Sequence, residues 1–123
     1  MPAHASLPLP RARRVKQGRD FARLKSQGRR LTKGCLIANW AGAPAGRPSR
    51  VGVITTKKIG NAVVRSRARR LLREVFRLHQ PDLKDPVDMI LVARNSIVGK
   101  RMAEVETDYL AALRQARLLK ETA

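Results

Sequence analysis

The segment from residue 64 to residue 79 limits the fold more strongly than any other part of the chain. At about 100° per residue on a helical wheel, its apolar side chains fall on one continuous arc. The arc consists of Val64, Ala68, Leu71, Leu72, Val75, Phe76 and Leu78. Gly60-Asn61 opens the segment, and Gln80-Pro81 ends it because proline disfavours further helix. We therefore predict a helix from about residue 61 to residue 78 that buries one face against another layer.

The opposite face of this predicted helix is almost purely arginine, and only Glu74 interrupts it with a negative charge. The arginines are Arg65, Arg69, Arg73 and Arg77, which form a ladder, and Arg67 and Arg70 beside it. Like charges one turn apart repel by roughly a few tenths of a kcal/mol per pair, so a face of one sign indicates a ligand. The planar guanidinium fork suits phosphate, which favours a phosphodiester backbone. Lys57, Lys58 and the backbone N–H groups of residues 61–64 extend this predicted anion-binding surface.

The charge of the whole chain indicates the same class of partner. Lys and Arg number 27 against 9 Asp and Glu, which gives a net charge of +18 and indicates a polyanion. The longest apolar run, residues 89–93, is far shorter than the ~20 residues that cross a bilayer. Residues 7–10 are too short and too rich in proline for a signal peptide. We expect a cytoplasmic protein that binds nucleic acid, although charge and periodicity alone do not separate RNA from DNA.

No residue pattern suggests catalysis or metal binding by the protein itself. Cys35 is the only cysteine, so an intrachain disulfide is excluded and a thiolate metal site would lack its other ligands. His4 and His79 lack a nucleophile and an orienting carboxylate in any recognisable arrangement. We expect no catalytic residue and no metal ligand on this chain, and we expect Cys35 to be buried.

The remaining periodicities predict strands and two further helices. A short helix is expected from Asp20, as its N-cap, to Gly28, with Phe21 and Leu24 on one face. Strands are predicted at residues 34–40, 51–56 and 87–93, the last of them buried and central, with an additional candidate at residues 29–33.

A closing helix is predicted by one apolar stripe, formed by Met102, Val105, Tyr109, Ala112, Leu113 and Ala116. The order of elements predicts an α+β fold in which helices pack on a small sheet. Residues 1–16 hold three prolines and a basic cluster but few large apolar groups, so we expect a disordered basic arm. Residues 17–120 are expected to form a single domain that binds nucleic acid.

Residues 56–74, from Thr56 through Lys57-Lys58-Ile59-Gly60-Asn61 to Arg73-Glu74, closely resemble the signature of the bacterial ribonuclease P protein family. Leu9-Pro10, Gly18-Arg19-Asp20-Phe21, Arg50-Val51-Gly52-Val53 and Leu91-Val92-Ala93-Arg94 are similar to other parts of that family. The resemblance covers roughly residues 9 to 119. It implies a small mixed sheet packed with three helices and an unusual left-handed β-α-β crossover through the basic helix, whereas such crossovers are right-handed in about 98% of cases.

The same resemblance implies a subunit of an endoribonuclease that removes the 5′ leader from precursor tRNA. The catalytic centre and its Mg²⁺ ions would belong to a partner RNA. Residues 17–120 would then form a single RNA-binding domain that holds this RNA and the leader. The residues implied to contact the catalytic RNA are Lys57, Lys58, Asn61, Arg65, Arg67, Arg69, Arg70 and Arg73. The residues expected at a leader cleft between the first helix and the sheet are Phe21, Lys25, Trp40 and Arg94. For Phe21, a role in the core is an almost equal alternative.

The sequence departs from the family pattern at three positions. Ser66 stands where the family usually has Asn, while Lys25 and Ala38 replace aromatic residues that often line the cleft. Weaker stacking on the leader and a larger contribution from backbone electrostatics are therefore expected.

Two other functions are compatible with a strongly basic helix. A ribosomal or other structural RNA-binding protein would carry a similar arm and helix, but the signature at residues 56–74 argues against it. A DNA-binding regulator ranks last, because no helix-turn-helix spacing is evident and an arginine face contacts phosphates more readily than base edges.

Overall fold

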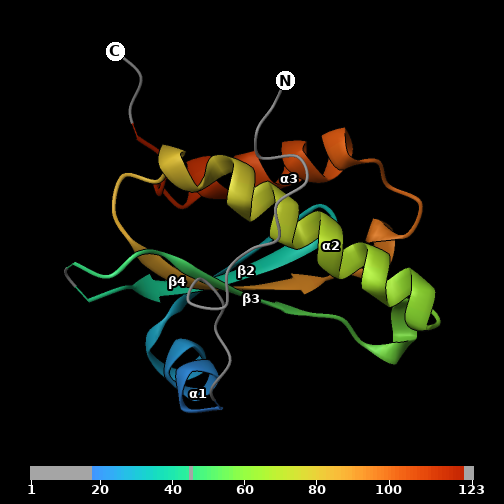
Figure 1. Cartoon of the computed structure of the whole chain (residues 1–123), viewed down its shortest axis with the longest axis horizontal. Helices are drawn as coiled ribbons and strands as arrows, with labels where there is room; N and C mark the ends of the chain where they lie inside the picture. The colour runs from blue at the N-terminus through green and yellow to red at the C-terminus, as the bar shows by residue number, and fades with distance from the viewer. Residues whose placement is uncertain (1–17, 45, 121–123) are drawn as a thin grey trace.

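The computed structural model describes residues 18–44 and 46–120, which form one sheet and three helices (Figure 1). The helices are α1 (Gly18–Gln27), α2 (Ala62–His79) and α3 (Met102–Gln115). The strands are β1 (Arg29–Lys33), β2 (Leu36–Gly42), β3 (Arg50–Ile54) and β4 (Val87–Ala93). Short 3-10 turns, η2 (Lys57–Ile59), η3 (Gln80–Asp82) and η4 (Asn95–Ile97), connect them. The predicted α+β class is confirmed, and the candidate strand at residues 29–33 is present as β1.

The sheet has the strand order β1-β2-β4-β3, with β3 parallel to β4 and the other neighbours antiparallel. The central position predicted for the run at residues 87–93 is confirmed, because β4 pairs with strands on both sides. Every residue of β4 except Val92 is buried. The apolar run at residues 89–93 is the pattern expected of a strand that is covered on both faces.

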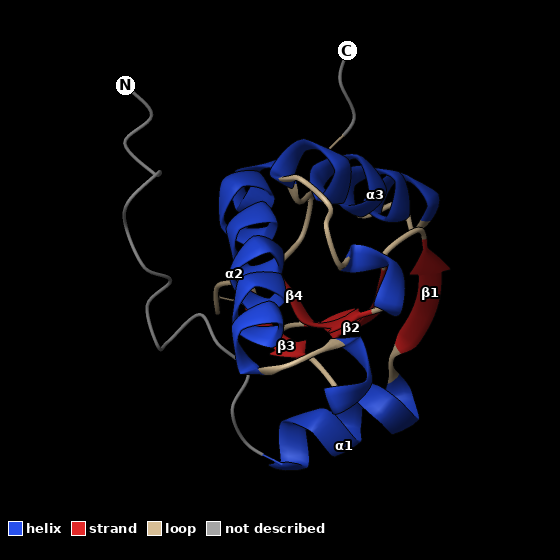
Figure 2. Cartoon of the chain, turned by 90° about the vertical axis from the view of Figure 1, so that its right-hand side faces the viewer, coloured by secondary structure: helices blue, strands red, loops and turns tan. Residues whose placement is uncertain are grey.

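The helices divide between the two faces of the sheet. Helices α2 and α3 lie side by side on one face, and α1 lies on the other (Figures 1 and 2). The main core fills the space beneath α2 and α3 and includes Phe76, Tyr109, Leu72, Met89 and Leu91. A much smaller cluster, formed by Leu24 of α1 and Ile90 of β4, lies between α1 and the other face of the sheet.

The connection from β3 through α2 to β4 has the unusual handedness that the family resemblance implied. With α2 in front of the sheet and the parallel strands pointing up, the chain steps leftward from β3 to β4 (Figures 1 and 2). The crossover is therefore left-handed. Because only residues 55–61, including the short turn η2, connect β3 to α2, the N-terminal end of α2 lies near the end of β3.

Helix α1 begins earlier than the sequence predicted and ends at the predicted glycine. The helix already includes Gly18, so Asp20 lies inside it and the prediction of Asp20 as its N-cap was wrong. At the other end, Gly28 donates its N–H to the carbonyl of Leu24 over 3.0 Å. A Cβ at Gly28 would approach the backbone oxygens of Leu24 and Trp40 to 2.5 and 2.6 Å, so only glycine fits this turn. Residues 1–16, predicted to be a disordered basic arm, lie outside the described residues.

Within the described part of the chain, no helix is long and apolar enough to cross a membrane.

Candidate nucleic-acid interface

The N-terminal end of α2 is fixed by short-range hydrogen bonds that also orient the basic residues around it. Asn61 is the N-cap, and its side-chain oxygen accepts from the N–H of Val64 over 3.0 Å. Gly60, at φ 148°, has a conformation that side chains rarely adopt, and a Cβ there would lie 2.9 Å from the Val64 side chain. The side chain of Asn61, predicted to contact RNA, therefore also caps α2.

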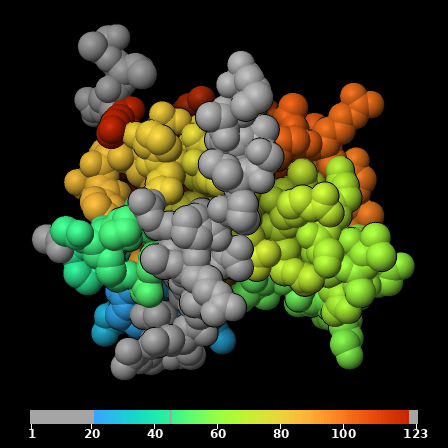
Figure 3. All heavy atoms as spheres, in the orientation of Figure 1, coloured from blue at the N-terminus to red at the C-terminus, as the bar shows by residue number. Residues whose placement is uncertain are grey.

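The predicted basic residues of η2 and α2 occupy one side of the molecule. Lys57, Lys58, Arg67 and Arg70 are exposed, whereas Arg65, Arg69 and Arg73 are partly buried. Figure 3 shows the residues of η2 and the first half of α2 as a broad continuous surface, coloured green to yellow-green. The opposite face of α2 buries Ala68, Leu72, Val75 and Phe76. The helical wheel therefore assigned the two faces of α2 correctly.

Several guanidinium groups on this surface are held by the protein. Arg69 donates to the hydroxyl of Thr55 over 2.7 Å and to that of Ser66 over 3.1 Å. Arg67 donates to the carbonyl of Lys100 over 2.7 Å, which links α2 to the loop before α3. The Nε of Arg65 is buried and has no hydrogen-bond partner among the residues that the structure describes. Ser66 therefore supports Arg69, a contact that its sequence position did not suggest.

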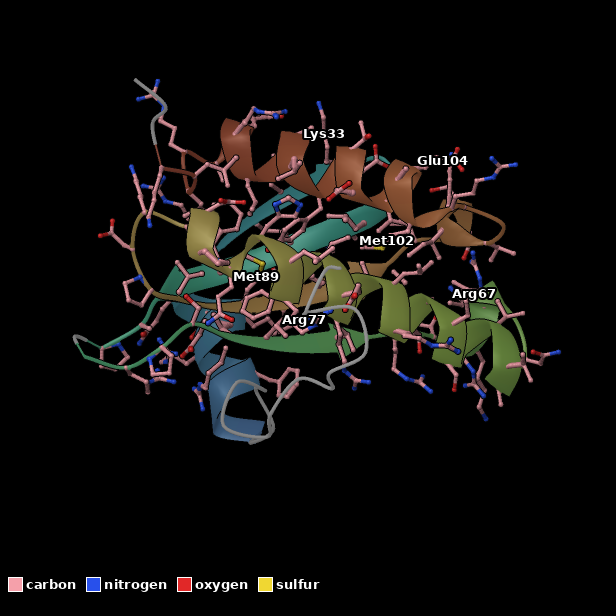
Figure 4. The ribbon with its side chains drawn as sticks, turned by 45° about the horizontal axis from the view of Figure 1, so that its top comes forward. Lys33, Arg67, Arg77, Met89, Met102 and Glu104 are labelled. Carbon is pink, nitrogen blue, oxygen red and sulfur yellow. The ribbon has the colours of Figure 1, made fainter. Side chains whose placement is uncertain are left out.

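Arg77 differs from the other arginines of the predicted ladder. Its guanidinium forms hydrogen bonds of 2.6 to 2.9 Å with the Glu74 carboxylate, and its side chain is only 12% exposed. Figure 4 shows Arg67 and Arg77 at different positions along α2. The arginines that could bind a phosphate therefore lie in the N-terminal part of α2, because the guanidinium of Arg77 is already paired with Glu74.

The predicted leader cleft lies on the α1 side of the sheet, and the structure brings together only part of its residue set. Phe21 is partly buried and packs on the cluster of Leu24 and Ile90, so both of its predicted roles are compatible with this position. Lys25 is exposed on the same helix. Arg94 is exposed just beyond β4 and donates to the carbonyl of Gly34 over 2.9 Å.

Trp40 lies on the opposite face of the sheet from Phe21, which corrects its assignment to the cleft. Its side chain is 9% exposed and belongs to the main core, as does that of Ala38. Side chains alternate along a strand, so Ala41 points toward α1 while Trp40 and Ala38 point toward α2 and α3. Neither residue 38 nor residue 40 can therefore determine stacking in a cleft beneath α1.

A charged cluster that sequence reasoning missed fixes α1 to the sheet. The fully buried Asp88 of β4 accepts hydrogen bonds of 2.5 to 3.1 Å from Arg23, Arg47 and Arg50. Burial alone would raise the pKa of Asp88, but the hydrogen bonds and charges of Arg50 and Arg47 outweigh it and hold the pKa below its usual value. The three arginines come from separate segments, so no local spacing could have revealed the cluster.

His79 and Cys35 also have structural partners. His79 bridges Asp82, at 2.8 Å, and Glu106, at 2.6 Å, and thereby joins the end of α2 to α3. Burial opposes its protonation, but the two carboxylates prevail and raise the pKa of His79. Cys35 is buried as predicted, and burial together with Asp108 raises the pKa of its thiol to about 12. Within the described residues, no group of three or more His, Cys, Asp or Glu side chains could hold a metal ion.

Comparison with known proteins identifies the family. The family model "Ribonuclease P" matches residues 9–117 of the chain. The chain is 36% identical over 107 residues to the ribonuclease P protein component of Gluconacetobacter diazotrophicus, covering 86% of this chain and 92% of that protein. It is 38% identical over 107 residues to that of Desulfatibacillum aliphaticivorans, covering 87% and 86%.

The chain belongs to the ribonuclease P protein family. A structure of a Staphylococcus aureus RNase P protein mutant matches the fold with a TM-score of 0.80 at 25% identity, covering 88% of this chain and 91% of that chain. The RNase P protein from Thermotoga maritima matches the fold with a TM-score of 0.74 at 22% identity, covering 83% and 98%. The family assignment made from residues 56–74 is therefore confirmed, and so is the ribonuclease P fold.

Proposed function

We propose that this protein binds the catalytic RNA of ribonuclease P and assists it in removing the 5′ leader from precursor tRNA. The observation that carries the proposal is the arginine face on the N-terminal part of α2, opposite a fully packed apolar face. A ribosomal role would leave the family signature on η2 and α2 without an explanation.

The α2 face is suited to an RNA backbone because part of it is pre-organised. Arg69 is held by Thr55 and Ser66, and Arg67 by the carbonyl of Lys100, before any ligand arrives. Side chains that are ordered in the free protein lose less conformational entropy on binding. Lys57, Lys58 and Arg70 are exposed and add electrostatic attraction to phosphates.

The single-stranded leader would bind on the other face of the sheet, beside α1. Phe21 is partly exposed there and offers one aromatic face for stacking, worth ~1–3 kcal/mol per base. Because Trp40 and Ala38 face the main core, Lys25 and Arg94 would supply most of the remaining attraction to the leader through its phosphates.

The hydrolysis itself would take place on the RNA, with Mg²⁺ ions held mainly by RNA phosphates. Asp82 and Glu106 are engaged by His79, and Asp88 is engaged by three arginines, so these carboxylates serve structural contacts. The protein would contribute binding and orientation in the cytoplasm, where tRNA precursors are processed, and no cofactor of its own.

Reconstitution with a bacterial ribonuclease P RNA at low Mg²⁺ tests this function. We expect the wild-type protein to stimulate release of the leader strongly. The triple variant Arg65→Ala/Arg69→Ala/Arg73→Ala should lose RNA affinity by about a hundredfold or more, with a salt dependence flattened by roughly 3 in the log–log slope. Because Arg69 also makes internal hydrogen bonds, the variant should lose roughly 1–2 kcal/mol of stability yet stay folded by circular dichroism.

The control removes the same charge from another surface. Arg29, Arg30 and Lys33 are exposed on β1, at the edge of the sheet far from β3 and α2 (Figure 2). Their triple Ala variant should stimulate cleavage almost as well as the wild type. Tight, salt-sensitive RNA binding without any stimulation, also with the RNA of the same organism, would rule out the processing role and favour a structural RNA-binding protein.

A further inference from the structure

A second basic surface lies at the opposite end of α2 from the interface described above. The C-terminal ends of α2 and α3 and the segment at residues 117–120 meet there (Figure 1). Between them lies a recess of about 1100 Å³ that is open to solvent. The recess is lined by His79, Asp82, Lys84, Leu110, Arg114, Arg117, Leu119 and Lys120. Since α2 has 18 residues, the recess lies roughly 27 Å from the N-terminal end of that helix.

The recess carries a surplus of positive charge that the described protein does not neutralise. Lys84, Arg114, Arg117 and Lys120 are all exposed, and none of them forms an ion pair with a carboxylate in the described part of the chain. Asp82 is the one carboxylate in the lining, and it is engaged by His79 at 2.8 Å. Four cations thus face a concave surface with apolar walls, which concentrates their field on any ligand inside.

The backbone that presents these cations is fixed by hydrogen bonds. Lys84 donates its N–H to the carbonyl of Leu118 over 2.9 Å, and Lys120 donates to that of Asp82 over 2.7 Å. Leu83 and Leu119 form an antiparallel bridge between these two segments. Two chain segments distant in sequence are therefore locked together with their lysines beside the end of α3.

Arg117 has an unusual backbone conformation in this recess. With φ at 60°, it is the one residue other than glycine with positive φ in the described chain. Arg117 follows the end of α3, and the N–H of Leu118 donates to the carbonyl of Leu113 over 2.9 Å. In helix ends of this kind, the position of Arg117 is ordinarily occupied by glycine. The negative end of the α3 dipole accounts for a cation such as Arg114 in the last turn. It does not account for Lys84 or Lys120, which come from other segments.

We propose that this recess is a second RNA-binding site that takes the phosphodiester backbone of structured RNA. The proposal rests on the proposed function, since the ligand would be a part of the catalytic RNA that the α2 face does not reach. The volume of the recess, about 1100 Å³, and its four cations suit a stretch of RNA backbone. Together, the two sites would hold RNA at both ends of α2 and fix the orientation of the protein on it.

The test measures the affinity of the full chain for a bacterial ribonuclease P RNA over a series of salt concentrations. The recess variant Lys84→Gln/Arg114→Gln/Lys120→Gln should lose about tenfold or more in affinity. Its slope of log K against log salt should flatten by about 2 to 3, because each lost phosphate contact contributes about 0.9. The matched control, Arg29→Gln/Arg30→Gln/Lys33→Gln, should change the slope by less than about 1.

A second variant separates binding from folding. Arg117→Gly removes one charge and places glycine where the left-handed backbone favours it, so the melting temperature should stay the same or rise. Its affinity for the RNA should nevertheless fall, with a slope lower by about 1. Hydroxyl-radical footprinting should show that the recess variant and the α2 variant lose protection of different RNA segments.

The outcomes distinguish this proposal from the proposed function. If the recess variants match the control while the wild type binds and stimulates the RNA, the second site is refuted and the processing role stands. If the wild type neither binds nor stimulates, both proposals fall. If the recess variants lose affinity only for vesicles of phosphatidylglycerol, the recess binds lipid phosphate and the RNA assignment is wrong.

Discussion

On one face of the sheet, α2 and α3 cover a core of twenty buried residues, whereas on the other face α1 covers a cluster with only two buried residues in the described chain. The first face is held by packing and supports the arginine surface on a rigid base. The second is held by Leu24, by partly buried neighbours such as Phe21, and by the Asp88 cluster. Regions with few buried apolar contacts unfold locally at a lower free energy, so α1 should detach from the sheet more easily than α2 or α3.

The largest loss of stability should come from a substitution in the core beneath α2 and α3. Replacing the fully buried Phe76 by Ala should lower the free energy of unfolding by about 3–5 kcal/mol, through lost burial and a residual cavity. Leu24→Ala, on the face of α1 that packs on the sheet, should cost only about 2 kcal/mol, because its partly exposed neighbours can move into the space. Urea unfolding measures both values. Equal losses, or a greater loss at Leu24, would contradict the difference proposed between the two faces.

The second effect concerns the charged tie that holds α1. Asp88→Asn should cost about 2–3 kcal/mol, below the value for a fully buried pair because its arginines are 19% to 31% exposed. Amide hydrogen exchange should accelerate in α1 and remain slow in the core-facing part of α2. The matched control, Asp85→Asn at an exposed position, should have no effect on either helix. Uniform acceleration in both helices would mean that Asp88 supports the whole fold and not α1 in particular.

These contrasts also explain which features the sequence could predict. The faces of α2 and the central place of β4 follow from apolar patterns that only one arrangement satisfies. The face to which Trp40 points does not follow, because β2 carries apolar residues on both of its faces and shifting the assignment by one residue exchanges them. For the same reason, the candidate cleft included a core residue.

Interactions between distant segments were also out of reach of sequence reasoning. Arg23 and Arg47 meet Asp88 across 65 and 41 positions of sequence, and no periodicity connects them. The ion pair of Arg77 with Glu74 could have been predicted, because the two residues are three positions apart on a helix. Counting the arginines on one face does not reveal it. Local patterns therefore identified the interface, and the tertiary contacts decide how each arginine is used.

The smallest effect sharpens the comparison through pH, since a titratable side chain with a shifted pKa holds helices on each face of the sheet: Asp88 holds α1, and His79 joins α2 to α3. The pKa of Asp88 is lowered, so its stabilisation is present above the unfolded value of about 3.9 and is lost as the pH falls through its folded pKa. The pKa of His79 is raised, so its stabilisation is present below about 6.5 and is lost as the pH rises through its folded pKa.

His79→Gln should therefore cost up to about 1 kcal/mol at pH 5.5 and almost nothing at pH 9. Thermal melts of both proteins at the two pH values measure this difference. A destabilisation that is equal at both values would show that His79 acts through packing against Tyr109, not through charge. If the prediction holds, acid loosens the α1 side while alkaline conditions loosen the junction of α2 and α3, and the two faces can be weakened independently in the unmodified protein.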